Sequence, residues 1–126
     1  MSIKILLVED QYHNIRLIEQ ILEDISENIE IVKAETGQIA ITLAKNQQFD
    51  LVLMDIALPD MNGIQITKIL RDYPQFKHTP FIAVTAYAML QDEESFKPVF
   101  DDYVSKPIDD DLFTEKVKKW IGDKLL

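Results

Sequence analysis

Five polar residues of the kinds that phosphoryl-transfer sites use come at the ends of short apolar segments of the chain. They are Glu9, Asp10, Asp55, Thr85 and Lys106. If these apolar segments are parallel strands of one sheet, their carboxyl ends share an edge, which is where open α/β sheets bind ligands. The side chains would then bring three carboxylates, a hydroxyl and an ammonium group into one site.

The three carboxylates predict a site for a divalent cation. Two carboxylates about 4 Å apart repel each other by roughly 4 kcal/mol at an effective dielectric constant near 20, so such a cluster normally holds a cation or a shared proton. Ligands that are all oxygen favour Mg²⁺ or Mn²⁺, and Mg²⁺ usually leaves coordination positions for water and phosphate. We therefore expect Glu9, Asp10 and Asp55 to bind Mg²⁺, with Mn²⁺ as the alternative ion.

Asp55 is the expected phosphoacceptor, because a carboxylate beside a neutralising cation can attack a phosphoryl group and form an aspartyl phosphate. Lys106 would pair with the phosphate oxygens, and the Thr85 hydroxyl would donate a hydrogen bond to one of them. Taken singly, these residues also fit ordinary structural roles. Glu9 and Asp10 could lie at a solvated helix N-terminus, and Thr85 could simply close a strand.

The segments around these residues alternate between strand-like and helix-like patterns, which is typical of βα units and a parallel sheet. The patterns predict strands over residues 3–8, 29–34, 51–54, 80–85 and 102–106. They predict a first helix that ends near Ser26, and further helices over 37–47, 64–73, 90–97 and about 112–121. Right-handed crossovers then favour an α/β fold of the doubly wound, flavodoxin-like class, with strand order 2-1-3-4-5 and five helices.

Chain length and composition indicate how many domains, which partners and which cellular location to expect. The 126 residues suit a single domain that spans residues 1–126. The net charge of -9, from 13 cationic and 22 anionic residues, argues against nucleic acid or an anionic membrane as a partner. The chain has no cysteine and no apolar stretch long enough to span a bilayer. We expect a cytoplasmic protein.

The predicted site residues lie in motifs that resemble the receiver domain of two-component response regulators, over essentially all 126 positions. The motifs are Leu7-Val8-Glu9-Asp10, Leu53-Met54-Asp55-Ile56, Leu58-Pro59-Asp60-Met61-Asn62-Gly63, Ala83-Val84-Thr85-Ala86 and Tyr103-Val104-Ser105-Lys106-Pro107. Each motif is weakly specific alone, but five in this order and spacing are highly specific. Residues 84–89 and 105–108 look most like single-domain receivers of the DivK type.

The resemblance implies a CheY-like sandwich and assigns further roles. It implies that the backbone carbonyl of Ala57 is another metal ligand, that Tyr103 is an aromatic switch beside the hydroxyl of Thr85, and that the Lys106–Pro107 bond is cis. A sensor histidine kinase or a histidine phosphotransfer protein would supply the phosphoryl group, and an unknown protein would receive the output. The chain would be a monomer or weak homodimer and not a turnover enzyme on outside substrates.

Other functions of related folds fit the residues less well. A flavodoxin would need a phosphate loop rich in Ser, Thr and Gly after the first strand, where Glu9 and Asp10 would repel a bare phosphate. A phosphatase with an aspartyl nucleophile usually has a second acid two residues later, and here that position is Ala57. The alternative that stays open is a pseudo-receiver, a binding module that keeps the fold without phosphorylation. For Tyr103, simple packing in an edge strand also stays open.

The chain departs from the usual receiver pattern just before the last strand. Most receivers have a small Gly-Ala or Gly-Cys step there, whereas this chain has Val99-Phe100-Asp101-Asp102 and is about one residue shorter. We therefore expect an abbreviated or displaced fourth helix and an unusual output surface. Phe96, Val99 and Phe100 are expected to be core residues rather than a partner-binding patch.

Overall fold

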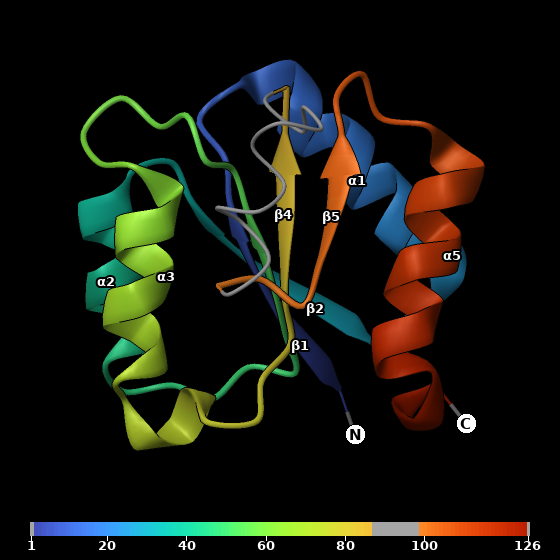
Figure 1. Ribbon diagram of the computed structural model, residues 1–126. Helices are drawn as coiled ribbons and strands as arrows, with labels where there is room; N and C mark the ends of the chain where they lie inside the picture. Colours follow the sequence, from blue (N-terminus) through green and yellow to red (C-terminus); the bar gives the residue numbers. More distant parts are fainter. Residues whose placement is uncertain (1, 87–98, 126) are drawn as a thin grey trace.

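A parallel sheet of five strands forms the centre of the computed structural model, which describes residues 2–86 and 99–125 (Figure 1). The strands are β1 (Ile3–Val8), β2 (Ile29–Ala34), β3 (Leu51–Met54), β4 (Phe81–Thr85) and β5 (Asp102–Ser105). Their order across the sheet is β2-β1-β3-β4-β5, and every neighbouring pair is parallel. The predicted topology is therefore confirmed.

Helices cover both faces of this sheet, as the doubly wound fold requires. Figure 1 shows α1 (Tyr12–Ile25) and α5 (Asp110–Ile121) on one side, and α2 (Gly37–Ala44) and α3 (Gly63–Arg71) on the other. Two short 3₁₀ turns, η1 (Pro74–Phe76) and η3 (Gly122–Lys124), follow α3 and α5. The predicted helix over 90–97 lies outside the described residues. None of the helices within 2–86 and 99–125 is long and apolar enough to cross a membrane.

Strand side chains alternate between two hydrophobic cores. Leu6 and Met54 point into the core beneath α2 and α3, while Leu7 and Leu53 point into the core beneath α1 and α5. All four of these side chains are buried. Covering on both faces explains why β1 and β3 are almost continuously hydrophobic.

Two helices end earlier than their sequence patterns predict. Helix α2 stops at Ala44 rather than at residue 47. At this end of the helix, the Nε2 group of Gln75 donates hydrogen bonds to the carbonyls of Ala44 and Lys45 at 2.9 and 3.2 Å. Helix α3 stops at Arg71, because Tyr73 precedes Pro74 and takes the extended backbone that a residue before proline prefers. Both differences concern one turn or less and leave the topology unchanged.

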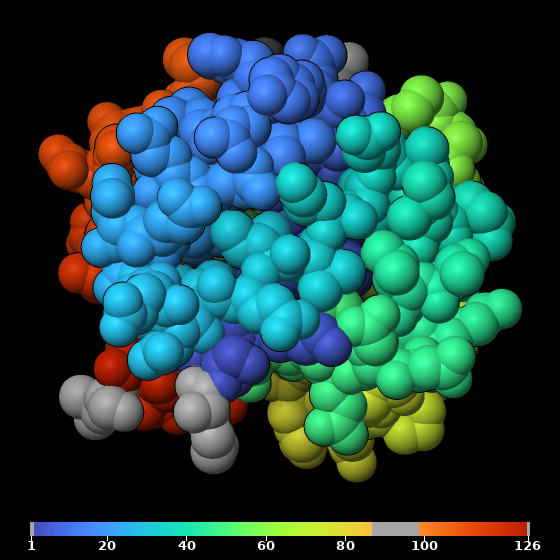
Figure 2. Space-filling model, turned by 180° about the vertical axis from the view of Figure 1, so that it is seen from behind, coloured from blue at the N-terminus to red at the C-terminus, as the bar shows by residue number. Residues whose placement is uncertain are grey.

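Strand β2 forms one edge of the sheet. Seen from behind, its residues lie between α1 and α2 (Figure 2), and no further strand pairs with it among residues 2–86 and 99–125. Glu30 and Lys33 are exposed on it. Charged side chains on an edge strand disfavour pairing with a strand of another chain.

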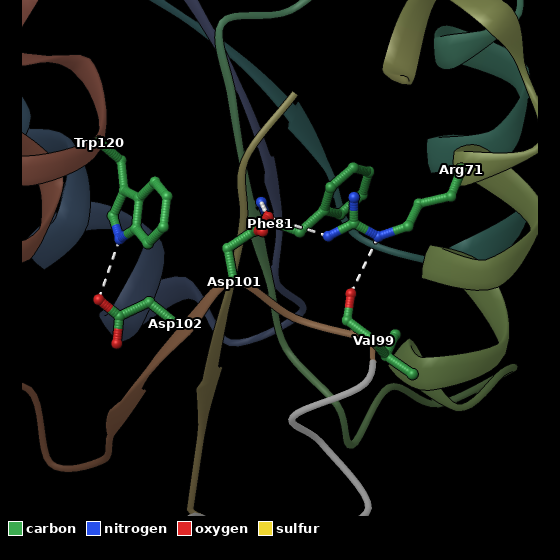
Figure 3. A network of polar contacts seen from close by, with 6 residues as sticks. All are labelled: Arg71, Phe81, Val99, Asp101, Asp102 and Trp120. Carbon is green, nitrogen blue, oxygen red and sulfur yellow. Dashed lines mark hydrogen bonds and ion pairs between the residues drawn. The ribbon is translucent and has the colours of Figure 1, made fainter. Parts of the chain in front are cut away.

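The opposite edge strand, β5, is attached to both helical layers through two successive aspartates (Figure 3). Asp101 accepts a hydrogen bond from Nη2 of Arg71 in α3 at 2.9 Å. Asp102 accepts one from the indole Nε1 of Trp120 in α5 at 2.9 Å, and another from Nζ of Lys116 at 2.9 Å. The start of β5 is thus fixed from both sides.

Arg71 also organises the segment that leads into β5. Its Nε donates to the carbonyl of Val99 at 2.9 Å, and its guanidinium carbon lies 4.4 Å from the centre of the Phe81 ring (Figure 3). Val99 and Phe100 are buried in the core on the α3 side. The prediction that these two residues are core is therefore confirmed, whereas Phe96 lies outside the described residues.

Candidate functional site

A cleft of about 340 Å³ opens at the carboxyl ends of the strands. Its lining residues come from the segments that follow β1, β3, β4 and β5: Asp10, Gln11, Asn14, Asp55, Ala57, Ala86 and Lys106. This is the edge at which open α/β sheets bind ligands. The sheet therefore brings the ends of distant segments of the chain to one place.

Three carboxylates meet at this edge of the sheet, and two of them, Asp10 and Asp55, line the cleft. Glu9, Asp10 and Asp55 each offer one oxygen, and these three oxygens lie within 4.8 Å of one another. Glu9 and Asp55 are buried, whereas Asp10 is exposed. They meet because β1 and β3 are adjacent, with Val8 opposite Met54 in the sheet register.

Lys106 supplies a positive charge to the cluster. Its Nζ lies 2.7 Å from Oε1 of Glu9 and 3.1 Å from Oδ2 of Asp55. Burial by itself would lower the pKa of Lys106, but its hydrogen bonds to Glu9 and Asp55 and their charges raise it above its usual value. The lysine is therefore a fixed cation at neutral pH.

The Asp55 carboxylate is held at both of its oxygens. Oδ1 accepts the N–H of Ala57 at 3.1 Å, and Oδ2 accepts a hydrogen bond from Nζ of Lys106 at 3.1 Å. Its backbone N–H donates to the carbonyl of Val8 at 2.9 Å, which ties the residue to β1. Asp55 is thus presented to the cleft in a fixed orientation.

Glu9 occupies a less favourable environment for its charge. Its Oε2 accepts the N–H of Gln11 at 3.0 Å, and its Oε1 faces Lys106. Burial raises the pKa of Glu9 above its usual value, and the nearby charge of Asp55 adds to this, although Lys106 and the Gln11 N–H oppose it. A second cation near Glu9 would stabilise its ionised form.

The remaining predicted residues lie close to this cluster. Thr85 is the last residue of β4 and is fully buried, and its carbonyl accepts the N–H of Lys106 at 3.0 Å. Tyr103 lies one strand away in β5, opposite Ala83. Its ring is partly buried, with Nζ of Lys116 5.1 Å from the ring centre. The Lys106–Pro107 bond is cis, as the resemblance implies.

Three residues of the cleft were not anticipated from the sequence: Gln11, Asn14 and Ala86. Gln11 is the N-cap of α1, and Asn14 lies three residues later, so both face the cleft from the start of that helix. The sequence feature that could have indicated Gln11 and Asn14 is the predicted change from strand to helix directly after Asp10, which places the first turn of that helix at the site.

The donor set fits a divalent cation. Three carboxylates and one ammonium group leave an excess of two negative charges, and carboxylate oxygens are the ligands that Mg²⁺ prefers. Within residues 2–86 and 99–125, the Asp10 carboxylate forms no hydrogen bond or ion pair, although it faces the cleft. An acid in this position is free to become a ligand.

The chain matches the family model of the response regulator receiver domain over residues 5–118. It is 38% identical to the polar-differentiation response regulator DivK of Brucella ovis over 124 residues, which are 98% of this chain and 99% of DivK.

Solved structures of receiver domains are also similar to this chain. The receiver domain of a sensor histidine kinase from Pseudomonas aeruginosa, which has a magnesium ion coordinated in its active-site cleft, is 31% identical with a TM-score of 0.85, over 97% of this chain and 99% of that one. A CheY-like receiver domain protein from Methanospirillum hungatei is 30% identical with a TM-score of 0.84, over 98% of this chain and 97% of that one.

These matches confirm the resemblance that the sequence motifs indicated, together with the CheY-like fold. They also confirm that the chain is a two-component signalling protein rather than a turnover enzyme on outside substrates. The chain belongs to the family of response regulator receiver domains and is similar to DivK over nearly its whole length.

Proposed function

We propose that residues 1–126 form one receiver domain in which Asp55 accepts a phosphoryl group from a phosphohistidine. The observation that supports this most strongly is the gathering of Glu9, Asp10, Asp55 and Lys106 around one open cleft. A sensor histidine kinase or a histidine phosphotransfer protein would be the donor, as family membership implies.

In this proposal, an Asp55 oxygen forms a bond to phosphorus while the bond between phosphorus and the histidine nitrogen breaks. The imidazole leaves with the electron pair and takes up a proton. Lys106 already contacts Oδ2 of Asp55, so its ammonium is placed to pair with the phosphoryl oxygens once they are attached there. The Thr85 hydroxyl, from the adjacent strand end, would donate to one of these oxygens.

The metal ligands in this proposal are the carboxylates of Glu9, Asp10 and Asp55 and the backbone carbonyl of Ala57. Mg²⁺, or Mn²⁺ in its place, would neutralise charge on the transferring phosphoryl group. The charge excess of the cluster and its all-oxygen donors support this assignment, as does the magnesium ion in the related Pseudomonas aeruginosa domain.

The output of the domain would be a change in its contacts with another protein. We propose Thr85 and Tyr103 as switch residues. Thr85 ends β4 beside the site, and Tyr103 lies on the neighbouring strand, β5. The acidic composition supports a protein partner rather than nucleic acid or an anionic membrane. The proposed location is the cytoplasm, where ATP is available to charge a histidine kinase.

Incubation with acetyl phosphate and Mg²⁺, followed by intact-mass analysis, tests the proposal. We expect a mass increase of one phosphoryl group, which should not form when the metal is chelated before the reaction or in the variant Asp55→Asn. The matched control is Asp50→Asn, an aspartate at the opposite end of β3 that lines a different cavity. A chain that takes up no phosphoryl group would be a pseudo-receiver. Equal uptake by Asp55→Asn would show that a residue other than Asp55 is the phosphoacceptor.

The aspartyl phosphate should hydrolyse slowly. Ala57 has no polar side-chain group to orient an attacking water, although it lies next to the cleft. We also expect the ring of Tyr87 to shield the phosphate; Tyr87 lies outside the described residues. Measuring the half-life of the purified phosphoprotein checks this expectation, and loss of the phosphate within seconds would contradict it.

A further inference from the structure

The loop between β3 and α3 is fixed at its base, next to the phosphoacceptor. Ala57 and Asn62 form an isolated antiparallel bridge, and the N–H of Gly63 donates to the carbonyl of Ile56 at 2.8 Å. A Cβ atom on Gly63 would lie 2.3 Å from the carbonyl oxygen of Asp55. The two ends of the loop therefore pack directly against each other.

The tip of the same loop is attached to a different helix. Oδ1 of Asp60 accepts the N–H of Gly37 at 2.8 Å, and Oδ2 accepts the N–H of Gln38 at 3.0 Å. These N–H groups belong to the first turn of α2, which has no partners for them within the helix. A carboxylate is favoured at a helix N-terminus, and the hydrogen bond from Gly37 holds the pKa of Asp60 below its usual value.

Close packing at Gly37 supports this attachment. A Cβ atom there would lie 2.7 Å from Cδ1 of Ile66 and 3.1 Å from Cβ of Met61. The N-terminus of α2 therefore lies directly against the loop and against α3. Asp60 therefore adds two hydrogen bonds between elements that are already packed together.

Thr36 provides an internal comparison. Its Oγ1 accepts the N–H of Ile39 at 3.1 Å and so caps the same helix. Thr36 precedes α2 directly, however, and this cap makes no link to the β3–α3 loop. Asp60 and Thr36 thus share one role, capping α2, and differ in a second, which is holding the loop.

We propose that Asp60 is a positioning residue for the phosphoacceptor site. By fixing the loop tip to α2, it would fix Ala57, three residues earlier, whose N–H donates to Oδ1 of Asp55 at 3.1 Å. This inference rests on the proposed function, in which the carbonyl of Ala57 is also a metal ligand. One loop residue would then orient both the phosphoacceptor and a ligand of the cation.

The variants Asp60→Ala and Thr36→Ala separate the two roles, because each removes a cap of α2 and only the first frees the loop. The Mg²⁺ dissociation constant, measured by calorimetry with the metal alone, should rise about 10-fold in Asp60→Ala, the usual effect of losing a group that supports a metal ligand. In metal-free protein, hydrogen exchange of residues 57–63 should become faster. Thr36→Ala should change neither quantity.

Asp60→Asn keeps one carbonyl oxygen as acceptor, so it should restore part of the Mg²⁺ affinity. If Asp60→Ala does not fold, Asp60→Asn tests the proposal instead. An unchanged Mg²⁺ dissociation constant in Asp60→Asn would then overturn it.

Equal effects of Asp60→Ala and Thr36→Ala on the Mg²⁺ dissociation constant and on hydrogen exchange would show that Asp60 is only a helix cap. If the parent protein itself binds no Mg²⁺, the proposed function fails and this role fails with it. If the parent binds Mg²⁺ and Asp60→Ala binds it equally well, only the positioning role fails.

Discussion

The ammonium nitrogen of Lys106 lies 2.7 Å from Oε1 of Glu9, and both side chains are largely withdrawn from water. The same nitrogen lies 3.1 Å from Oδ2 of Asp55. Within residues 2–86 and 99–125, no other cation forms an ion pair with either carboxylate. Lys106 therefore offsets part of the negative charge that a bound metal ion would otherwise offset alone.

Replacing Lys106 should therefore have opposite effects on the affinity for Mg²⁺ and on the rate of phosphorylation. In Lys106→Met, loss of the ammonium removes its repulsion of Mg²⁺, so the affinity for Mg²⁺ should rise, by up to about tenfold for 1.4 kcal/mol of repulsion removed. The rate of phosphorylation by acetyl phosphate should instead fall by about 10²-fold or more, because a donor to the phosphoryl oxygens is lost. Calorimetry and intact-mass kinetics measure the two effects.

Lys77→Met is the control for this variant, because Lys77 is an exposed lysine outside the cleft and its loss changes the net charge equally. It should leave both quantities unchanged. A parallel decrease of Mg²⁺ affinity and phosphorylation in Lys106→Met would show that the lysine mainly holds the carboxylates in place.

Gly63 should tolerate no side chain. An alanine Cβ would lie 2.3 Å from the carbonyl oxygen of Asp55 and 2.7 Å from Cα of Ile56, and both of these are backbone atoms that cannot turn aside. We expect Gly63→Ala to lower the free energy of unfolding by about 3 kcal/mol or more. Gly122→Ala has no atom within 4 Å of its Cβ and should be nearly neutral. Urea unfolding of both variants checks this, and equal midpoints would contradict it.

Asp102 should make the protein sensitive to acid. Burial by itself would raise the pKa of Asp102, but hydrogen bonds from Trp120 and Lys116 lower it below its usual value. Its contribution to stability is therefore fully present above the unfolded-state pKa of about 3.9 and is lost as the pH falls through the lower folded-state value. Unfolding free energy should decline over this acid range in the parent protein.

In Asp102→Asn the unfolding free energy should decline less at acid pH than in the parent protein. At pH 7 it should be less stable by about 1.5–3 kcal/mol, because Lys116 loses a charged partner, and the difference from the parent should shrink in acid. Urea titrations followed by circular dichroism at several pH values measure this. Asp24→Asn, at an exposed position on α1, serves as the control. Parallel stability curves for parent and Asp102→Asn would count against the assignment.

Arginine at position 71 should not be replaceable by lysine. In Arg71→Lys an ammonium could keep the ion pair with Asp101, but the hydrogen bond from Nε to the carbonyl of Val99 and the contact of the guanidinium with the Phe81 ring would be lost. We expect a loss of about 1–3 kcal/mol in unfolding free energy. Lys68→Ala, on the exposed side of the same helix, should cost little by comparison. Denaturant unfolding at neutral pH compares them.

Much of this architecture could be predicted from the sequence, because the strong signals are local. Apolar runs such as Leu51–Met54 are buried on both faces, and the polar residue that follows each run lies at the carboxyl edge of the sheet. Asp55 and Lys106 could be assigned to one site for this reason, although 51 residues separate them.

The sequence did not show which side chains connect elements that are distant in the chain. Asp60 lies in a turn motif that fits any exposed loop, and nothing local indicates that it caps a helix 22 residues earlier. The hydrogen bonds of Arg71 to Val99 and Asp101 are similar, since an arginine in the last turn of a helix also suits the helix dipole. Such pairings depend on tertiary packing.

The indole of Trp120 gives the molecule an optical probe of the β5 edge of its sheet. It is the single tryptophan of the chain, and its N–H donates to Asp102, the residue before Tyr103. Any rearrangement of β5 that alters this bond should change the intrinsic fluorescence of the unlabelled protein. If phosphorylation rearranges β5, as the proposed roles of Thr85 and Tyr103 require, the reaction can be followed in real time without dyes or mutations.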